Sequence, residues 1–202
     1  MKIAVLAVQG AFAEHIDKLK RLGVDCIELR QRADLEQDID GLILPGGEST
    51  VQGKLLQDLQ MLEPLRDRIS RGLPVLGTCA GLILLARKIS NDGAVWLGTL
   101  PVCVQRNAYG RQLGSFHTEA EVKGIGTVPM TFIRAPYVES LMETQDGEAL
   151  ARVDGRIVAV RYGNQIGTAF HPELDEDDRI HEMFLHLCRK TAPDKRITGT
   201  DR

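Results

Sequence analysis

The chain has 202 residues, of which 43% are hydrophobic and 26% charged, and these proportions exclude a disordered chain, a collagen and a coiled coil. It has 28 acidic and 25 basic residues, a net charge of -3, so binding to DNA or RNA is not expected. The length predicts a single domain over residues 1–190, followed by a frayed polar tail over residues 191–202.

The apolar runs are short, and residues 3–8 fall well below the roughly 20 residues that span a membrane. A buried strand explains this run better than a signal peptide does. The four cysteines form no Cys-x-x-Cys pair, so neither a zinc site nor a disulfide framework is indicated. These patterns predict a cytoplasmic protein that needs no metal or cofactor and contacts no membrane.

The first half alternates apolar runs, which predict buried strands, with amphipathic stretches, which predict helices. Strands are expected at residues 2–8, 24–29, 41–44 and 73–76. Helices are expected at residues 12–22, 49–56, 63–71 and 82–89, with a connector or short helix at residues 33–40. Ser49 and Gln52 fit a capping box at one helix start. This alternation predicts a parallel sheet with helices on both faces.

The second half changes character, because its apolar runs follow one another with tight turns between them. Strands are expected at residues 95–104, 119–122, 131–133, 157–161 and 165–170. Gly163 and Asn164 favour a hairpin turn between the last two of these strands. A terminal helix is expected at residues 177–188. The sequence therefore predicts one α/β protein.

Cys79 stands at the end of a predicted strand, in the pattern Gly-x-Cys-x-Gly at residues 77–81. This is the layout of a nucleophile elbow, in which a tight strand-to-helix turn projects the nucleophile above the sheet. The positive end of the next helix favours a thiolate, and the amide of Ala80 points to where an oxyanion forms. The alternative is a small buried residue in a glycine turn. The other three cysteines lie in apolar patterns and are expected in the core.

A thiolate that attacks an amide needs an acid to protonate the departing nitrogen. His171 follows a predicted strand and precedes Pro172, which disfavours helical backbone at the residue before it. Glu173 is placed to orient the imidazole and to stabilise its cation. A lone histidine is more often structural, but the two motifs together favour a Cys-His-Glu triad.

The run Pro-Gly-Gly-Glu-Ser-Thr at residues 45–50 joins a predicted strand to a predicted helix. It exposes backbone amides at a helix start, where they can hold an oxyanion or an anionic part of a substrate. An ordinary strand-to-helix turn explains the same residues equally well. The run lacks the Gly-Lys-Ser/Thr ending of a phosphate loop, so nucleotide binding is not favoured.

The remaining histidines lack this context. His15 is expected on the solvent-exposed surface of a helix. His181 and His186 both fall on the terminal helix, at a spacing that does not bring two metal ligands to one helix face.

Together, these motifs resemble the class I, triad-type glutamine amidotransferases. Within that class, further matches make the chain similar to the glutaminase subunits of pyridoxal 5'-phosphate synthases. These matches are Gln9-Gly10, Arg106-Asn107, Gly-Arg-Gln at residues 110–112 and Phe-Ile-Arg-Ala-Pro at residues 132–136. The resemblance covers residues 2–188, and the runs at 45–50 and 132–136 are more specific than the triad alone.

The resemblance implies a three-layer, flavodoxin-like α/β fold, with a mostly parallel sheet flanked by helices and a small antiparallel addition. It implies hydrolysis of L-glutamine to L-glutamate and ammonia through a thioester. Carried over by position, Cys79 is the nucleophile, His171 the base and acid, and Glu173 its orienting partner. The amides of Gly47 and Ala80 would hold the oxyanion.

The resemblance also implies substrate contacts and a protein partner. An arginine suits the α-carboxylate of glutamine, and Gln9 would lie beside the oxyanion loop and report partner docking. The partner is a (β/α)8-barrel synthase subunit in a large hetero-oligomer, which receives the ammonia and activates the glutaminase. The residues expected to contact glutamine are Gly47, Glu48, Ser49, Arg106, Ile133 and Arg134.

Alternative functions remain open at this point. The glutaminase subunit of imidazole glycerol phosphate synthase shares the size and triad order but lacks the runs at 45–50 and 132–136. A partner-independent thiol hydrolase on a related sheet is a second alternative, and a binding module without chemistry is disfavoured because all three triad residues are present. Tyr109 and His117 depart from the family pattern, which leaves details of the pocket and partner surface open.

Overall fold

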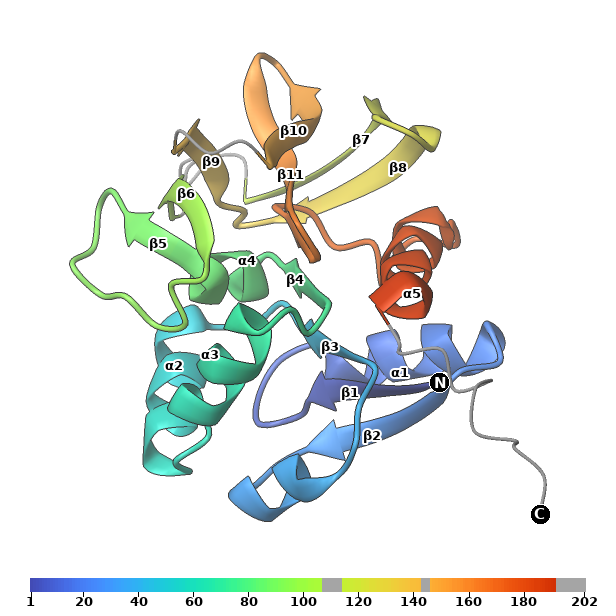
Figure 1. Cartoon of the computed structure of the whole chain (residues 1–202). Helices are drawn as coiled ribbons and strands as arrows, with labels where there is room; N and C mark the ends of the chain where they lie inside the picture. The colour runs from blue at the N-terminus through green and yellow to red at the C-terminus, as the bar shows by residue number, and fades with distance from the viewer. Residues whose placement is uncertain (107–113, 143–145, 192–202) are drawn as a thin grey trace.

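The computed structural model describes residues 1–106, 114–142 and 146–191. Twelve strands in these ranges form one mixed sheet, and helices lie on both sides of its parallel part (Figure 1). The α/β class expected from the sequence is confirmed. Of the predicted polar tail, residues 192–202 lie outside the described ranges.

The parallel part of the sheet comes mainly from the first half of the chain. Its strand order is β2-β1-β3-β4-β12, and each neighbouring pair is parallel. Helices cover both faces, so the central strands β3 and β4 are buried along their whole length. These strands are β1 (Lys2–Leu6), β2 (Asp25–Leu29), β3 (Gly41–Leu44), β4 (Val75–Thr78) and β12 (Gln165–Thr168).

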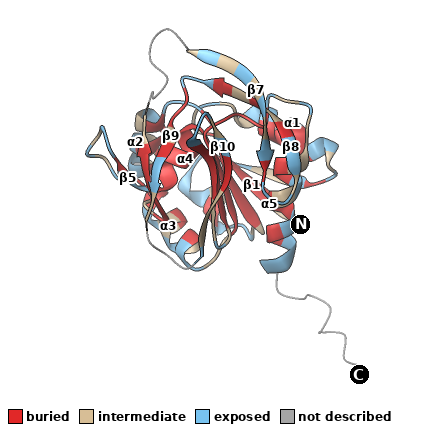
Figure 2. Cartoon of the chain, turned by 90° about the horizontal axis from the view of Figure 1, so that it is seen from above, coloured by how far each residue is buried: buried red, intermediate tan, exposed pale blue. Residues whose placement is uncertain are grey.

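The helices divide between the two faces of this parallel part. α1 (Phe12–Arg21) and α5 (Arg179–Thr191) cover one face (Figure 1). α2 (Ser49–Asp58), α3 (Leu62–Ser70) and α4 (Ala80–Leu85) cover the other, and a short 3-10 helix, η1 (Arg32–Glu36), follows β2. Buried residues gather along the strands and the inner helix sides (Figure 2).

The antiparallel part continues the same sheet beyond β12. The expected hairpin at Gly163 and Asn164 joins β11 to β12, with Tyr162 paired to Gln165. The path then runs β11-β10-β7-β8, while β9 pairs with both β11 and β6. The strands are β5 (Ala86–Ile89), β6 (Leu100–Gln105), β7 (Ser115–Val122), β8 (Gly126–Ile133), β9 (Tyr137–Leu141), β10 (Gly147–Val153) and β11 (Arg156–Tyr162).

Two expected elements in the first half differ from the structure. The helix expected at residues 82–89 ends at Leu85, where the chain turns into β5 and pairs with β6. The expected capping box is wrong, because Glu48 caps α2 and accepts a hydrogen bond from the amide of Thr50. The Gln52 side chain instead donates to the carbonyls of Gln9 and Pro45.

The strand expected at residues 95–104 begins only at Leu100. Residues 95–99 form a loop that seats Trp96 against α2, where a Cβ at Gly53 would lie 2.2 Å from the indole Cδ2. Strands β9 and β10 were not expected.

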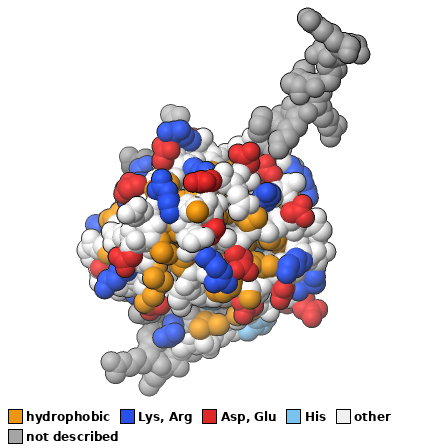
Figure 3. Space-filling view, turned by 90° about the horizontal axis from the view of Figure 1, so that it is seen from below, with side chains coloured by type: hydrophobic (Ala, Val, Ile, Leu, Met, Phe, Trp, Pro, Cys, Tyr) orange, Lys and Arg blue, Asp and Glu red, His pale blue; other side chains and the backbone are white. Residues whose placement is uncertain are grey.

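Basic and acidic side chains are interspersed over the face in Figure 3. Within the described residues, no helix is long and apolar enough to cross a membrane.

Candidate active site

Cys79 forms the predicted elbow between β4 and α4. Its backbone angles are φ 48° and ψ -97°, a conformation rare for a residue with a side chain. The flanking glycines are needed for close packing. A Cβ at Gly81 would lie 2.0 Å from the carbonyl oxygen of Leu44, and one at Gly77 would lie 2.7 Å from the carbonyl carbon of Gly81. The elbow therefore presses α4 against the sheet and presents the sulfur at the strand end.

His171 and Glu173 follow β12, the strand beside β4. The amide of His171 donates to the carbonyl of Thr131 at 2.8 Å, which anchors this segment to β8. The Nδ1 atom of His171 lies 2.7 Å from Oε1 of Glu173. The other ring nitrogen, Nε2, has no hydrogen-bond partner among the described residues, and the nearby Cys79 side chain acts on the charge of this ring. Neighbouring parallel strands thus bring the three predicted triad residues together.

The electrostatics of this cluster favour a charged pair. Burial opposes the imidazolium, but hydrogen bonds with Cys79 and Glu173 outweigh it and raise the pKa of His171 to about 10. Burial also opposes the carboxylate, yet contact with His15 and the hydrogen bond from His171 lower the pKa of Glu173. His171 can therefore hold a proton beside the sulfur and pass it to a leaving group.

A pocket of about 290 Å³ opens beside Cys79 and His171. All the predicted substrate-contact residues line it, together with Gln9. Ala80 and Glu173 are not among the lining residues, because Ala80 starts α4 and Glu173 lies behind the imidazole. Gly10 and Gly46, which belong to motifs seen in the sequence, also line the pocket, and the lining residues that the sequence did not single out are Ala11 and Ile83.

The loop before α2 forms one wall of this pocket. A Cβ at Gly46 would lie 2.3 Å from Cε1 of His171, so the imidazole packs directly on the loop backbone. A Cβ at Gly10 would lie 2.0 Å from the carbonyl oxygen of Gly46. The amide of Glu48 donates to Oε1 of Gln9 at 2.9 Å, so Gln9 lies beside the loop that was predicted to hold the oxyanion.

The two predicted arginines lie differently. Arg106 is paired with carboxylates, at 2.9 Å from Oε1 of Glu48 and 2.7 Å from Oδ2 of Asp92. Arg134 is exposed, and its backbone has a φ of 43° next to Ile133, whose carbonyl lies 3.9 Å from Sγ of Cys79. The family-like residues 107 and 110–112 lie outside the described ranges, as does Tyr109.

The expectation that His15 lies on the surface is wrong. Its side chain is fully buried between α1, α5 and the segment after β12. The sequence carried a signal for this, because His15 stands one helical turn before Leu19 and beside Ile16 on the apolar side of α1. Lys18, which is also fully buried, was missed for the same reason. The described residues contain no group of three or more side chains suited to a metal ion.

A family model covers nearly the whole chain. It is described as the SNO glutamine amidotransferase family and matches residues 5–190. The chain belongs to this family. The membership accords with a buried Cys-His-Glu cluster at one end of the parallel strands.

Relatives of known identity are similar over almost their full length. The chain is 65% identical over 185 residues to the pyridoxal 5'-phosphate synthase subunit PdxT of Desulfitobacterium hafniense (strain DSM 10664 / DCB-2). This alignment covers 92% of each of the two chains. The chain is 56% identical over 193 residues to the PdxT subunit of Streptococcus pneumoniae (strain CGSP14), covering 94% of this chain and 98% of that one. A crystal structure of a glutamine amidotransferase superposes with a TM-score of 0.87 at 44% identity. The match covers 93% of this chain and 98% of that chain.

Proposed function

We propose that this chain hydrolyses L-glutamine to L-glutamate and ammonia, and that the ammonia feeds pyridoxal 5'-phosphate synthesis. The observation that carries the proposal is the Cys79–His171–Glu173 cluster beside a pocket in a member of the glutamine amidotransferase family. The names of the similar synthase subunits support the destination of the ammonia.

The first half of the reaction forms a thioester. His171 takes the thiol proton of Cys79, and the sulfur attacks the side-chain amide carbon of glutamine. The amides of Gly47 and Ala80 hold the oxyanion of the tetrahedral intermediate. As the carbon–nitrogen bond breaks, His171 returns its proton to the leaving nitrogen, which departs as ammonia.

The second half of the reaction releases glutamate. Neutral His171 takes a proton from water, and the resulting hydroxide attacks the thioester carbon. The carbon–sulfur bond breaks, and a proton returns to the sulfur through His171. Glu173 keeps the imidazole in the tautomer and orientation that both halves need.

The substrate contacts follow from the pocket lining. Gly47, Glu48 and Ser49 line the pocket, and the carbonyl oxygen of Ile133 lies 3.9 Å from Sγ of Cys79. Arg134 offers an exposed guanidinium for the α-carboxylate. Arg106 holds Glu48 in place and so fixes the start of α2.

The partner is a (β/α)8-barrel synthase subunit in a large hetero-oligomer. A glutaminase that turned over alone would waste glutamine, so its oxyanion loop should respond to docking. Gln9 is suited to this role, because its side chain already holds the amide of Glu48. Docking that moves Gln9 changes the position of the loop that supplies an oxyanion donor.

The test is glutamate release with and without the pyridoxal 5'-phosphate synthase partner. We expect release to rise when the partner is added and to stay unchanged with the synthase subunit of imidazole glycerol phosphate synthase. Cys79→Ala should abolish release while the variant still folds and binds the partner. Full activity in that variant, or wild-type turnover of esters without any partner, contradicts the proposal.

A further inference from the structure

Glu173 has two carboxylate oxygens, and His171 occupies only Oε1. The second oxygen, Oε2, has no hydrogen-bond partner among the described residues but lies 3.4 Å from Nε2 of His15. Both side chains are fully buried, so water does not compete at this contact. His15 is therefore the group that sets where the second oxygen lies.

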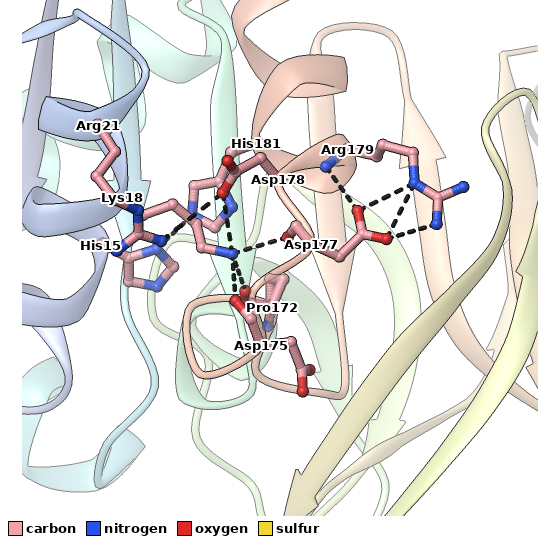
Figure 4. A network of polar contacts seen from close by, with 9 residues as sticks. All are labelled: His15, Lys18, Arg21, Pro172, Asp175, Asp177, Asp178, Arg179 and His181. Carbon is pink, nitrogen blue, oxygen red and sulfur yellow. Dashed lines mark hydrogen bonds and ion pairs between the residues drawn. The ribbon is translucent and has the colours of Figure 1, made fainter.

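The contacts of His15 extend beyond Glu173. Its Nε2 atom lies 3.2 Å from Oγ1 of Thr78, the residue that directly precedes Cys79. Its Nδ1 atom lies 2.9 Å from Nε2 of His181 on α5. Figure 4 shows His15 on the side of α1 that faces α5 and the segment after β12. One imidazole thus links α1, α5, β4 and the predicted triad.

A single arrangement of protons satisfies these contacts with neutral rings. If His181 donates from Nε2 to Nδ1 of His15, then His15 carries its own proton on Nε2. The nitrogen that carries this proton lies 3.2 Å from Oγ1 of Thr78 and 3.4 Å from Oε2 of Glu173. This series of hydrogen bonds ends at Nδ1 of His181, which has no hydrogen-bond partner among the described residues. His181 therefore selects the tautomer in which His15 is a donor to Glu173.

The electrostatics agree with neutral rings. Burial lowers the pKa of His15 below its usual value, and Glu173 opposes that shift only in part. Burial, together with the neighbouring His15, lowers the pKa of His181 well below its usual value. The titratable or charged groups that act on these two rings are Glu14, Lys18, Arg21, His171 and Glu173.

We propose that His15 is a positioning residue for the predicted triad, which orients Glu173 through Oε2 while His181 holds His15 in the required tautomer. This inference rests on the proposed hydrolysis of glutamine. His15 touches neither substrate nor sulfur. It acts because a carboxylate fixed at both oxygens cannot rotate away from Nδ1 of His171.

Two isosteric substitutions separate this role from simple packing. In His15→Gln the amide nitrogen takes the position of Nε2, so the donor to Glu173 is retained. In His15→Asn the amide nitrogen takes the position of Nδ1, so that donor is lost. With the synthase partner present, we expect His15→Asn to lower kcat by roughly 10-fold to 100-fold with KM almost unchanged. His15→Gln should stay within about 3-fold of wild type.

The same pair at His181 gives a second test. His181→Gln keeps a donor at the position of Nε2, whereas His181→Asn does not. We expect His181→Asn to lower kcat less than His15→Asn does, because it acts through one more side chain. Equal kcat values for the Gln and Asn variants at position 15 would overturn the inference, since packing alone does not distinguish the two nitrogens.

A second measurement separates this inference from the proposed function. The rate at which iodoacetamide alkylates Cys79 can be followed by the mass of its peptide across a pH series. This rate reports the protonation of the sulfur–imidazole pair and does not need glutamine turnover. We expect His15→Asn to shift that pH profile and His15→Gln to preserve it. If wild type releases no glutamate, the proposed function fails while this profile still decides the role of His15.

Cys188→Ala is the matched control for folding. Cys188 is buried on α5, the helix that carries His181. Its sulfur packs closely on β3, because a Cβ added at Gly41 would lie 2.5 Å from it. Its loss leaves a small cavity without touching the histidines. We expect lower stability, an unchanged kcat and an unchanged alkylation profile. A shift of that profile equal to that of His15→Asn would show that general loosening explains the result, and would overturn the inference.

Discussion

One side of the His171 imidazole packs against the backbone of the loop before α2. Gly46 is the reason, because a Cβ there would lie 2.3 Å from Cε1 and 2.8 Å from Nδ1 of the ring. Both distances are shorter than real carbon contacts. The glycine therefore permits the ring to lie between Cys79 and Glu173.

Gly46→Ala should displace the imidazole and impair catalysis more than folding. Because a shift of about 1 Å in a catalytic group can cost roughly 100-fold in rate, we expect a loss of that order in kcat for glutamate release. Gly93→Ala is the control, since nothing lies within 4 Å of the Cβ it adds. An active Gly46→Ala enzyme would show that the ring does not need this position.

The proposed roles of His171 and Glu173 predict unequal losses. His171→Asn should lower kcat by about 1000-fold or more, because it removes the group that moves the proton. Glu173→Gln should lower it less, because the carboxyl group orients the ring without itself transferring a proton. Steady-state kinetics with the partner present measure both. An equal or larger loss in Glu173→Gln would mean that the roles are assigned wrongly.

At the scale of elements, α1 anchors the segment that carries His171. Lys18 is fully buried, and its Nζ atom donates to the carbonyls of Pro172, Asp175 and Asp177 at 2.9, 2.6 and 2.7 Å. It also lies 3.3 Å from a carboxylate oxygen of Asp178 (Figure 4). A single ammonium group thus binds three backbone carbonyls of the segment between β12 and α5.

Lys18→Met should destabilise the protein by about 3 kcal/mol, because it leaves several inward-facing carbonyls and a carboxylate without their cation. Urea unfolding measures this change. Lys20→Met is the control, since Lys20 is exposed on the same helix and its loss should change stability by less than about 0.5 kcal/mol. Similar stability of the two variants would contradict the anchoring role.

At the scale of the whole molecule, the buried histidines make stability depend on pH. Folding lowers the pKa of His15 and His181 below the usual histidine value of 6.5, mainly through burial. Below that pH the unfolded chain binds protons that the folded protein excludes, so stability falls as pH falls. His171 acts at alkaline pH. Folding raises its pKa to about 10, so it contributes stability that is lost as pH rises from 6.5 toward 10.

The free energy of unfolding should therefore fall between about pH 7 and about pH 5, by up to about 1.4 kcal/mol per pH unit for each buried imidazole. Urea titrations at several pH values measure this slope. His181→Gln removes one of the two groups, so its slope should be about half that of wild type. A wild-type stability that stays flat over this range would contradict the prediction.

Local patterns were enough to predict the parallel strands, the elbow at Cys79 and the His-Pro-Glu segment. Each of these depends on residues that are neighbours in the chain, such as the glycines around Cys79. The carboxyl ends of neighbouring parallel strands meet at one edge of a sheet. The sequence could therefore predict that Cys79 and His171 come together. Strand β9 was missed because it pairs with β6 and β11, which are distant in the chain. Strand β10 pairs with the next strand, β11, across a tight turn at Asp154 and Gly155, a local signal that the sequence analysis did not use.

Only the tertiary structure decided how the predicted triad is supported. His15 was expected to face solvent, yet α5 and the segment after β12 bury it, and these follow it by more than a hundred residues in the chain. The same packing turns Lys18 from a surface lysine into an internal cation. The apolar side of α1 indicates that some element packs there, but which element packs against His15 depends on residues that are distant in the chain. The sequence determined the reacting groups, and the packing of α1 against α5 determined what surrounds them.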